Sequence, residues 1–100
     1  MAASSISAST YDTAVAVTAS DTVNDPALST AGTAASAYGY FAALWVGTAT
    51  SGQTVKVTTP SGDTPTFILA GNGTLIPVHV IRVWVTGTNA SNILGLVARP

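Results

Sequence analysis

The segment QTVKVTTPSGD, residues Gln53–Asp63, carries the clearest secondary-structure signal in the chain. Val55 and Val57 alternate with Thr and Lys, so the two valines fall on one side of an extended chain and the polar residues on the other. This period of two is typical of a β-strand with one buried face. The Pro and Gly that follow suit a turn, so we expect the strand to end at Thr59.

Apolar runs separated by turn residues continue through the second part of the chain. Besides Gln53–Thr59, we expect strands over Tyr40–Val46, Thr64–Leu69, Thr74–Thr86 and Ser91–Ala98. Gly and Asn in the intervening segments supply the positive φ angles that turns need. Short strands spaced about ten residues apart are typical of an antiparallel β-sandwich or barrel. We therefore predict an all-β fold, with sandwich and barrel both open.

The stretch IPVHVIRVWVT, residues Ile76–Thr86, holds the only His of the chain and one of its two Trp residues. Pro77 cannot donate to a strand ladder, so we expect a bend there. A single strand over Val78–Thr86 would alternate between two faces, both of them mostly apolar. This predicts a central strand that is covered on both sides. One face would carry Val78, Val80, Arg82 and Trp84, and the other His79, Ile81, Val83 and Val85.

Residues 1–38 differ in composition, because they consist mainly of Ala, Ser and Thr. Within them, Tyr11–Thr18 alternates apolar residues with small or polar ones and predicts one strand. Ser29–Ala37 predicts at most a weak Ala-rich helix. We expect an extended Ala/Ser/Thr-rich N-terminal arm over residues 1–38, held by neighbouring subunits, and a β-sandwich domain over residues 39–100.

The chain has few charges for its size. Charged residues make up 7% of its 100 residues, whereas about a quarter is typical of soluble domains. Hydrophobic residues make up 47%, and the net charge is −1. A surface with so little charge does not repel a second copy, which favours association with itself or with a partner. A secreted, weakly charged monomer is the alternative.

Charge and composition also argue against several partners and cofactors. The basic residues Lys56, Arg82 and Arg99 are far apart in sequence, whereas nucleic acid needs clustered Lys and Arg. No run approaches the ~18 apolar residues of a membrane helix. The chain has no Cys, and one His without Cys or Glu does not supply a usual transition-metal site. We expect no nucleic acid, no membrane, no metal and no cofactor.

Catalytic chemistry finds little support in the sequence. His79 is the only candidate for a His base, and no Gly-x-Ser-x-Gly motif accompanies it. The chain has no Glu, and its four Asp residues lie in turn-like or Thr-rich contexts. We expect that the protein is not an enzyme, and that His79 belongs to a strand or to an interface.

Aromatic residues gather at the junction of the arm and the β unit. They form either core or a subunit interface, where aromatic residues are enriched. The four aromatic residues of the junction are Tyr38, Tyr40, Phe41 and Trp45.

We expect Arg82 to pair with a carboxylate or to lie at an interface.

A series of short motifs resembles one known family. In chain order they are LWVGTA (44–49), VKVTT (55–59), GDT (62–64), TF (66–67), GTLIPV (73–78), RVW (82–84), TGT (86–88) and NI (92–93). This order and spacing is similar to the small head spike-base and capsid decoration proteins of tailed phages and gene transfer agents. The likeness covers roughly residues 44–97. The combination of GTLIPV, RVW and TGT is its most specific part.

The resemblance implies a non-enzymatic virion component on the outer surface of an icosahedral capsid. Such a protein would self-associate around a symmetry axis, contact the major capsid protein and present a platform for a head fibre protein. The candidate subunit or capsid contacts are Tyr11, Tyr38, Tyr40, Phe41, Trp45, His79, Arg82 and Trp84.

Two alternatives remain beside the spike base. One is a capsid cement protein without a fibre, which grips the capsid through the arm. The other is a carbohydrate-binding β module that contacts glycans through Trp45, Trp84 or Tyr40, and this requires at least one of the three rings to be exposed.

Overall fold

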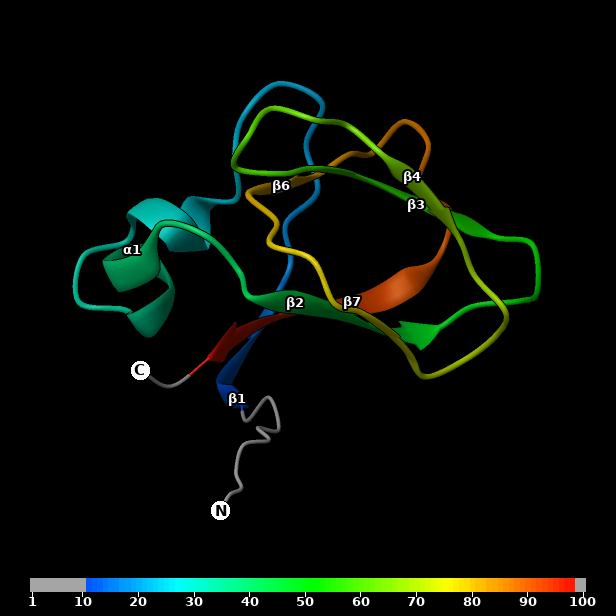
Figure 1. The fold of residues 1–100 in the computed structure, drawn as a ribbon, viewed down its shortest axis with the longest axis horizontal. Coiled ribbons are helices and arrows are strands. Elements are labelled where there is room, and N and C mark those ends of the chain that lie inside the picture. The colour runs from blue at the N-terminus through cyan, green and yellow to red at the C-terminus, as the bar shows by residue number, and fades with distance from the viewer. Residues whose placement is uncertain (1–10, 99–100) are drawn as a thin grey trace, which may run out of the picture.

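The computed structural model describes residues 11–98. This part of the chain forms seven strands and two short helical segments (Figure 1). The helical segments, both between β1 and β2, are the 3-10 helix η2 (Pro26–Ser29) and the α-helix α1 (Ala34–Tyr38). The strands are β1 (Tyr11–Ala16), β2 (Ala43–Thr48), β3 (Thr54–Thr58), β4 (Thr66–Ile68), β5 (Thr74–Ile76), β6 (Arg82–Val83) and β7 (Ser91–Ala98).

The strands form two antiparallel sheets. The first sheet has the strand order β1-β7-β2-β5, and the second has the order β4-β3-β6. Figure 1 shows β3, β4 and β6 lying over β1, β2 and β7. The predicted all-β fold is confirmed, and it takes the form of a sandwich.

The core consists of aliphatic side chains from the facing surfaces of the two sheets. Val55 and Val57 of β3 are fully buried, as the alternation in Gln53–Thr59 predicts. Leu44 and Val46 of β2 are also fully buried and belong to the same cluster. Burying one aliphatic side chain of this size stabilises the fold by roughly 1.5–3 kcal/mol. β2 and β3 therefore contribute side chains to one core that joins the two sheets.

Gly95 lies within β7 and leaves room for the largest core side chain. A Cβ atom at this position would lie 2.5 Å from Cδ1 of Phe41, much closer than the optimal separation of nonbonded carbon atoms. Phe41 is 0% exposed, and its backbone exchanges two hydrogen bonds with Val80, at 2.8 and 3.0 Å. Gly inside a strand often marks such a close approach. Phe41 is therefore a core residue.

The stretch Ile76–Thr86 is not the single central strand that its alternation predicts. β5 lies in the first sheet, whereas β6 pairs with β3 in the second. Val80 and Val83 are both buried, although strict alternation would put them on opposite faces. The chain changes phase between these two residues because it passes from one sheet to the other. β6 is consequently a two-residue strand at the edge of its sheet.

The segment after β1 crosses between the two sheets. The N–H of Val17 donates to the carbonyl oxygen of Ile93 in β7, at 3.1 Å. The N–H of Ser20 then donates to the carbonyl oxygen of Val83 in β6, at 2.9 Å. Residues 17–25 therefore form a strap that covers the edge of β6 and joins both sheets.

β1 belongs to the sandwich, because it pairs with β7 over most of its length. The expected boundary at residue 38 therefore does not separate two parts in space. The strand predicted over Tyr11–Thr18 is present as β1. Residues 1–10 of the predicted arm lie outside the described residues.

Two short helical segments stand where a weak helix is predicted over Ser29–Ala37. Oγ1 of Thr33 accepts the N–H of Ser36 at 3.1 Å and caps the start of α1. Gly39 ends it in the left-handed region, with a φ of 77°. The segment thus forms a short helical connection at one end of the sandwich (Figure 1).

Candidate functional site

The outer face of the first sheet is apolar. Leu44 and Val46 point into the core, so Ala43 and Trp45 point away from it. Trp45 pairs in register with Leu75 of β5 on one side and with a residue of β7 on the other. Ala43 is 0% exposed, so we define the apolar outer face by the six residues that remain accessible: Ala14, Ala16, Trp45, Leu75, Leu94 and Leu96.

The apolar outer face carries no charge and exposes two large side chains. Trp45 is 39% exposed and Leu75 is 43% exposed. The indole of Trp45 lies against Gly73, where a Cβ atom would be 3.4 Å from two ring carbons. At the border, Nδ2 of Asn92 donates to Oγ1 of Thr48 at 2.6 Å. This surface can bury apolar area against another apolar surface, but it offers no charge for an ionic ligand.

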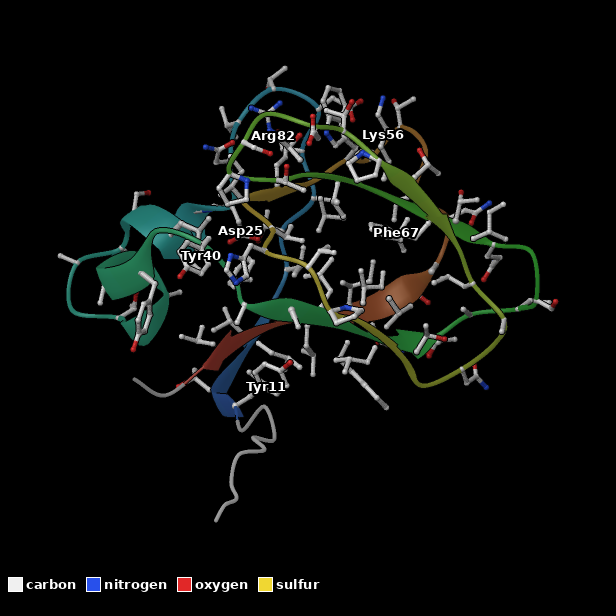
Figure 2. All side chains as sticks on the ribbon, viewed as in Figure 1. Tyr11, Asp25, Tyr40, Lys56, Phe67 and Arg82 are labelled. Carbon is white, nitrogen blue, oxygen red and sulfur yellow. The ribbon has the colours of Figure 1, made fainter. Side chains whose placement is uncertain are left out.

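The outer face of the second sheet carries the basic side chains of the described residues. Thr58 of β3 pairs in register with Arg82 of β6, and Nε1 of Trp84 donates to Oγ1 of Thr58 at 2.8 Å. The Nζ atom of Lys56 lies 4.3 Å from the centroid of the Trp84 ring, and Cζ of Arg82 lies 5.3 Å from it. We call Lys56, Thr58, Arg82 and Trp84 the Trp84 cluster. Figure 2 shows Lys56 and Arg82 on the side of the molecule away from the first sheet.

The guanidinium group of Arg82 has weak partners. Its Nη2 donates to the carbonyl oxygen of Thr22 at 3.4 Å, a long distance for a hydrogen bond, and its buried Nε has no partner. Among the described residues, no carboxylate forms a salt bridge within 4.0 Å of Arg82 or Lys56. Both cations therefore lie against the indole ring without a salt bridge among the described residues.

Asp21 lies close enough to Lys56 for their charges to attract each other, but it is held by Thr86. Oγ1 and the backbone N–H of Thr86 donate to the carboxylate at 2.6 and 2.9 Å. The side-chain hydrogen bond, followed by the backbone bond and the attraction of Lys56, lowers the pKa of Asp21 below its ordinary value. The carboxylate is therefore ionised at neutral pH.

A stack of aromatic rings lies near the end of α1. The rings of Tyr40 and His79 are 4.3 Å apart between centroids and inclined by only 18°. Tyr38 lies 6.2 Å from Tyr40 in a tilted arrangement. His79 is exposed, and both Tyr residues are half-buried. The His79 ring is held at the surface because it packs against the face of the Tyr40 ring.

A groove lies between the strap and the start of β7. Its volume is about 240 Å³, and it is lined mainly by Val17, Val83, Val85, Ala90 and Ile93. Binding sites for small molecules usually measure about 300–1,000 Å³, so this groove is smaller than a usual site.

Within residues 11–98, no three His, Asp, Glu or Cys residues come together as metal ligands. In the same range, no helix has the length and apolar character needed to cross a bilayer.

The predicted contact residues lie in separate parts of the fold. Arg82 and Trp84 share one cluster, Trp45 stands on the apolar outer face, and Phe41 is in the core. Tyr11 is half-buried at the start of β1 and pairs in register with Ala98. The remaining three form the aromatic stack, which contains Tyr38, Tyr40 and His79.

Sequence reasoning missed the neighbours of these residues. Leu75 and Leu94 complete the surface around Trp45, and the strand pairing that brings them together is not visible in the sequence. Lys56 appeared only as an outward polar residue of its strand. Its position 28 residues before Trp84 gives no sign of their contact.

Comparison with known proteins adds no relative to this picture. Searches of family models, curated proteins and solved structures found no match to the chain.

Proposed function

We propose that this protein is a structural subunit that self-associates on the outer surface of a phage-like capsid, as a spike base or decoration protein. The apolar outer face carries this proposal, because a surface without charge around an exposed Trp45 and Leu75 is suited to burial. The capsid is inferred from the resemblance of residues 44–97 to head spike-base proteins. The same resemblance names the major capsid protein as a partner and a head fibre protein as a second protein that the subunit would carry.

A second copy of this chain is the occupant that the apolar outer face fits best. The net charge of −1 produces little repulsion between copies. The face has no charged group that would select a partner of opposite charge. A standard interface contains about 20–30 residues on each side, so the six residues of the apolar outer face would form its apolar centre. We infer a non-enzymatic role, since such a surface binds without chemistry.

The test is the solution mass of the protein by light scattering on a sizing column. We expect a discrete oligomer for the wild type and a shift toward the monomer for Trp45→Glu. A charge that is buried without a partner costs about 3–5 kcal/mol, which weakens association at least about 100-fold. Circular dichroism should show that the variant remains folded, because the replaced side chain points away from the core.

Ile68→Glu is the matched control. Ile68 is 78% exposed on β4 of the second sheet, far from the apolar outer face in the strand order. It should keep the mass of the wild type. A wild-type protein that stays monomeric at high concentration and does not bind capsids would overturn the proposal. So would equal loss of mass in both variants, because the oligomer would then not depend on this face.

The solution mass of the wild-type protein also distinguishes a spike base from a cement protein. A ring of five or six copies favours a spike base at a vertex, and a monomer that binds capsids favours a cement protein.

The glycan-binding alternative requires an exposed aromatic ring, and Trp45 meets this requirement. Trp84 is half-buried and lies against two cations. Retention of the protein on a glycan array, lost in Trp45→Glu but not in Ile68→Glu, would favour that alternative.

A further inference from the structure

The groove between the strap and the start of β7 is an apolar recess in the side of the sandwich, and we call it the strap groove. Val17 and Ile93 line it from the side of the first sheet, and Val83 and Val85 from the side of the second. Val83 is 1% exposed and lies at its base, whereas Val85 is 57% exposed and lies at its opening. The volume of about 240 Å³ exceeds the roughly 150 Å³ of an apolar cavity that binds benzene. The strap groove can therefore hold one large apolar side chain.

The occupant of the strap groove has to be apolar. None of the residues that line it is charged. Two polar side chains at its edge are already engaged. Oγ1 of Thr88 accepts the N–H of Lys56 at 2.9 Å, and Nδ2 of Asn92 donates to Oγ1 of Thr48 at 2.6 Å. A charged or strongly polar group that entered the groove would lose its contacts with water and gain little in return.

The chain carries an apolar pair of suitable size on its own surface. Trp45 and Leu75 face each other in register on β2 and β5, and both are exposed. The indole rests against Gly73, so its position is fixed before any contact and little freedom is lost on docking. A Trp side chain that fills a desolvated pocket is a usual centre of binding energy in interfaces.

The strap groove and the apolar outer face lie on opposite sides of the first sheet. Ile93 and Leu94 are neighbours on β7, so their side chains point to opposite faces. Ile93 packs against the core and lines the groove, whereas Leu94 belongs to the apolar outer face. A copy whose groove receives Trp45 of a second copy therefore keeps its own Trp45 free for a third. Head-to-tail contacts of this kind close into a ring or continue as a filament.

We propose that the strap groove of one copy binds Trp45 and Leu75 of a second copy, head to tail. This inference rests on the proposed function, because it names the surface against which the apolar outer face packs. A second copy is favoured over a different protein, because neither surface has a charge that would select a partner of opposite charge. The net charge of −1 also produces little repulsion between copies.

Val85→Glu tests the strap groove without changing the apolar outer face. Val85 is exposed in the single chain, so the variant should fold, but in the oligomer its carboxylate would be buried without a partner. We expect association at least about 100-fold weaker than in the wild type, seen as a monomer by light scattering on a sizing column. Val23→Glu is the matched control, because Val23 is also 57% exposed and does not line the groove. It should keep the mass of the wild type.

A second variant excludes a local effect of Asp21. This carboxylate accepts the N–H of Thr86, next to Val85, and would repel a second negative charge there. Val85→Lys places the opposite charge at the same opening and should be a monomer as well. Circular dichroism checks that each variant is folded.

A mixture of two variants identifies the two surfaces that meet. Trp45→Glu retains the groove and Val85→Glu retains Trp45, so an equimolar mixture can form one contact between two chains and no further contact. We expect each variant alone to be a monomer and the mixture to contain a dimer of one chain of each. A symmetric contact between two apolar outer faces would instead leave Val85→Glu as an oligomer on its own.

The outcomes separate this inference from the proposed function. An oligomer that is lost in Trp45→Glu but kept in Val85→Glu would overturn the inference and leave the proposed function standing. Two monomeric variants whose mixture stays monomeric at about 1 mM would also overturn it. If the wild type binds capsids as a monomer and Val85→Glu does not bind, a capsid segment rather than a second copy fills the groove, and the inference is wrong. A monomeric wild type that does not bind capsids would overturn both.

Discussion

The two sheets of this sandwich are held in different ways. The central strands of the first sheet, β2 and β7, are six and eight residues long and pair along most of their length. In the second sheet, β4 and β6 are only three and two residues long. Short strands supply few backbone hydrogen bonds, so the second sheet needs other partners for β3.

Side chains from the loop after β6 act as these partners. Oγ1 of Thr88 accepts the N–H of Lys56 at 2.9 Å, and Oδ1 of Asn89 accepts the N–H of Thr54 at 2.8 Å. The N–H of Asn89 in turn donates to the carbonyl oxygen of Thr54 at 3.0 Å. The loop thereby continues the edge of β6 along β3 with side-chain oxygens in place of backbone ones. The first sheet thus depends more on packing, and the second on polar contacts from loops.

The largest effect is therefore expected from overpacking the first sheet. Gly95→Ala places a methyl group 2.5 Å from the ring of the fully buried Phe41. Overpacking a core costs typically 1–3 kcal/mol, and we expect about 3 kcal/mol here because neither the ring nor the strand has free space. Urea unfolding followed by fluorescence measures the loss in the free energy of unfolding.

Gly71→Ala is the matched control for this substitution. Nothing lies within 4 Å of a Cβ atom at Gly71, and its φ is not in the left-handed region. Its free energy of unfolding should stay within about 0.5 kcal/mol of the wild type. A smaller side chain in Phe41→Leu should reduce the cost of Gly95→Ala, because the two positions share one space. Additive costs would contradict the contact.

A smaller loss is expected from the strap that joins the two sheets. Asp25 is 3% exposed, and its carboxylate accepts the N–H of Thr18 at 2.8 Å and the N–H of Ala27 at 2.9 Å. Asp25→Ala leaves both donors without their partner, which costs about 1–3 kcal/mol. Thermal unfolding of the variant should show a clear decrease in Tm.

Asp63→Ala provides the comparison, because Asp63 lies exposed in the turn after β3 and accepts only one side-chain bond, from Ser61 at 3.2 Å. We expect a change of less than about 0.5 kcal/mol there. Equal losses for the two variants would mean that the strap does not depend on its buried carboxylate.

The local patterns of the sequence were sufficient for the fold class. Val55 and Val57 are buried and Lys56 is turned outward, because a strand in one sheet keeps its phase. The same rule failed for Ile76–Thr86, since a change of sheet resets the phase and leaves no mark in the hydrophobic pattern. The choice of sandwich over barrel also depends on which strands pair, and pairing is a long-range property.

The candidate surfaces were only partly predictable. Large aromatic and basic residues stand out in a chain of Ala, Ser and Thr, which is how Trp45, Arg82 and Trp84 were found. Their partners Leu75 and Lys56 come from other strands, and only the register brings them near. Phe41 stood out in the sequence but its role did not, because residue type alone cannot distinguish an aromatic ring in the core from one at an interface. Its assignment rests on the space left by Gly95.

The smallest effect is expected at Asp21, and it should depend on pH. The pKa of Asp21 is lowered in the folded protein, chiefly by the hydroxyl of Thr86. A lowered carboxylate pKa stabilises the fold at any pH above the ordinary value of about 3.9, and this contribution is lost as the pH falls through the folded pKa. The difference in unfolding free energy between wild type and Asp21→Asn should therefore be constant near neutral pH and shrink below about pH 4.

Thr86→Val separates this hydrogen bond from general acid denaturation. It removes the hydroxyl that donates at 2.6 Å but keeps the backbone N–H that donates at 2.9 Å. The pKa of Asp21, followed by the carbon chemical shift of its carboxyl group, should rise toward the ordinary value in this variant. An unchanged titration would show that the hydroxyl does not hold the carboxylate. In that case the contact between the strap and the loop after β6 would rest on the backbone N–H of Thr86, and the side-chain contacts that distinguish the second sheet would be those of Thr88 and Asn89.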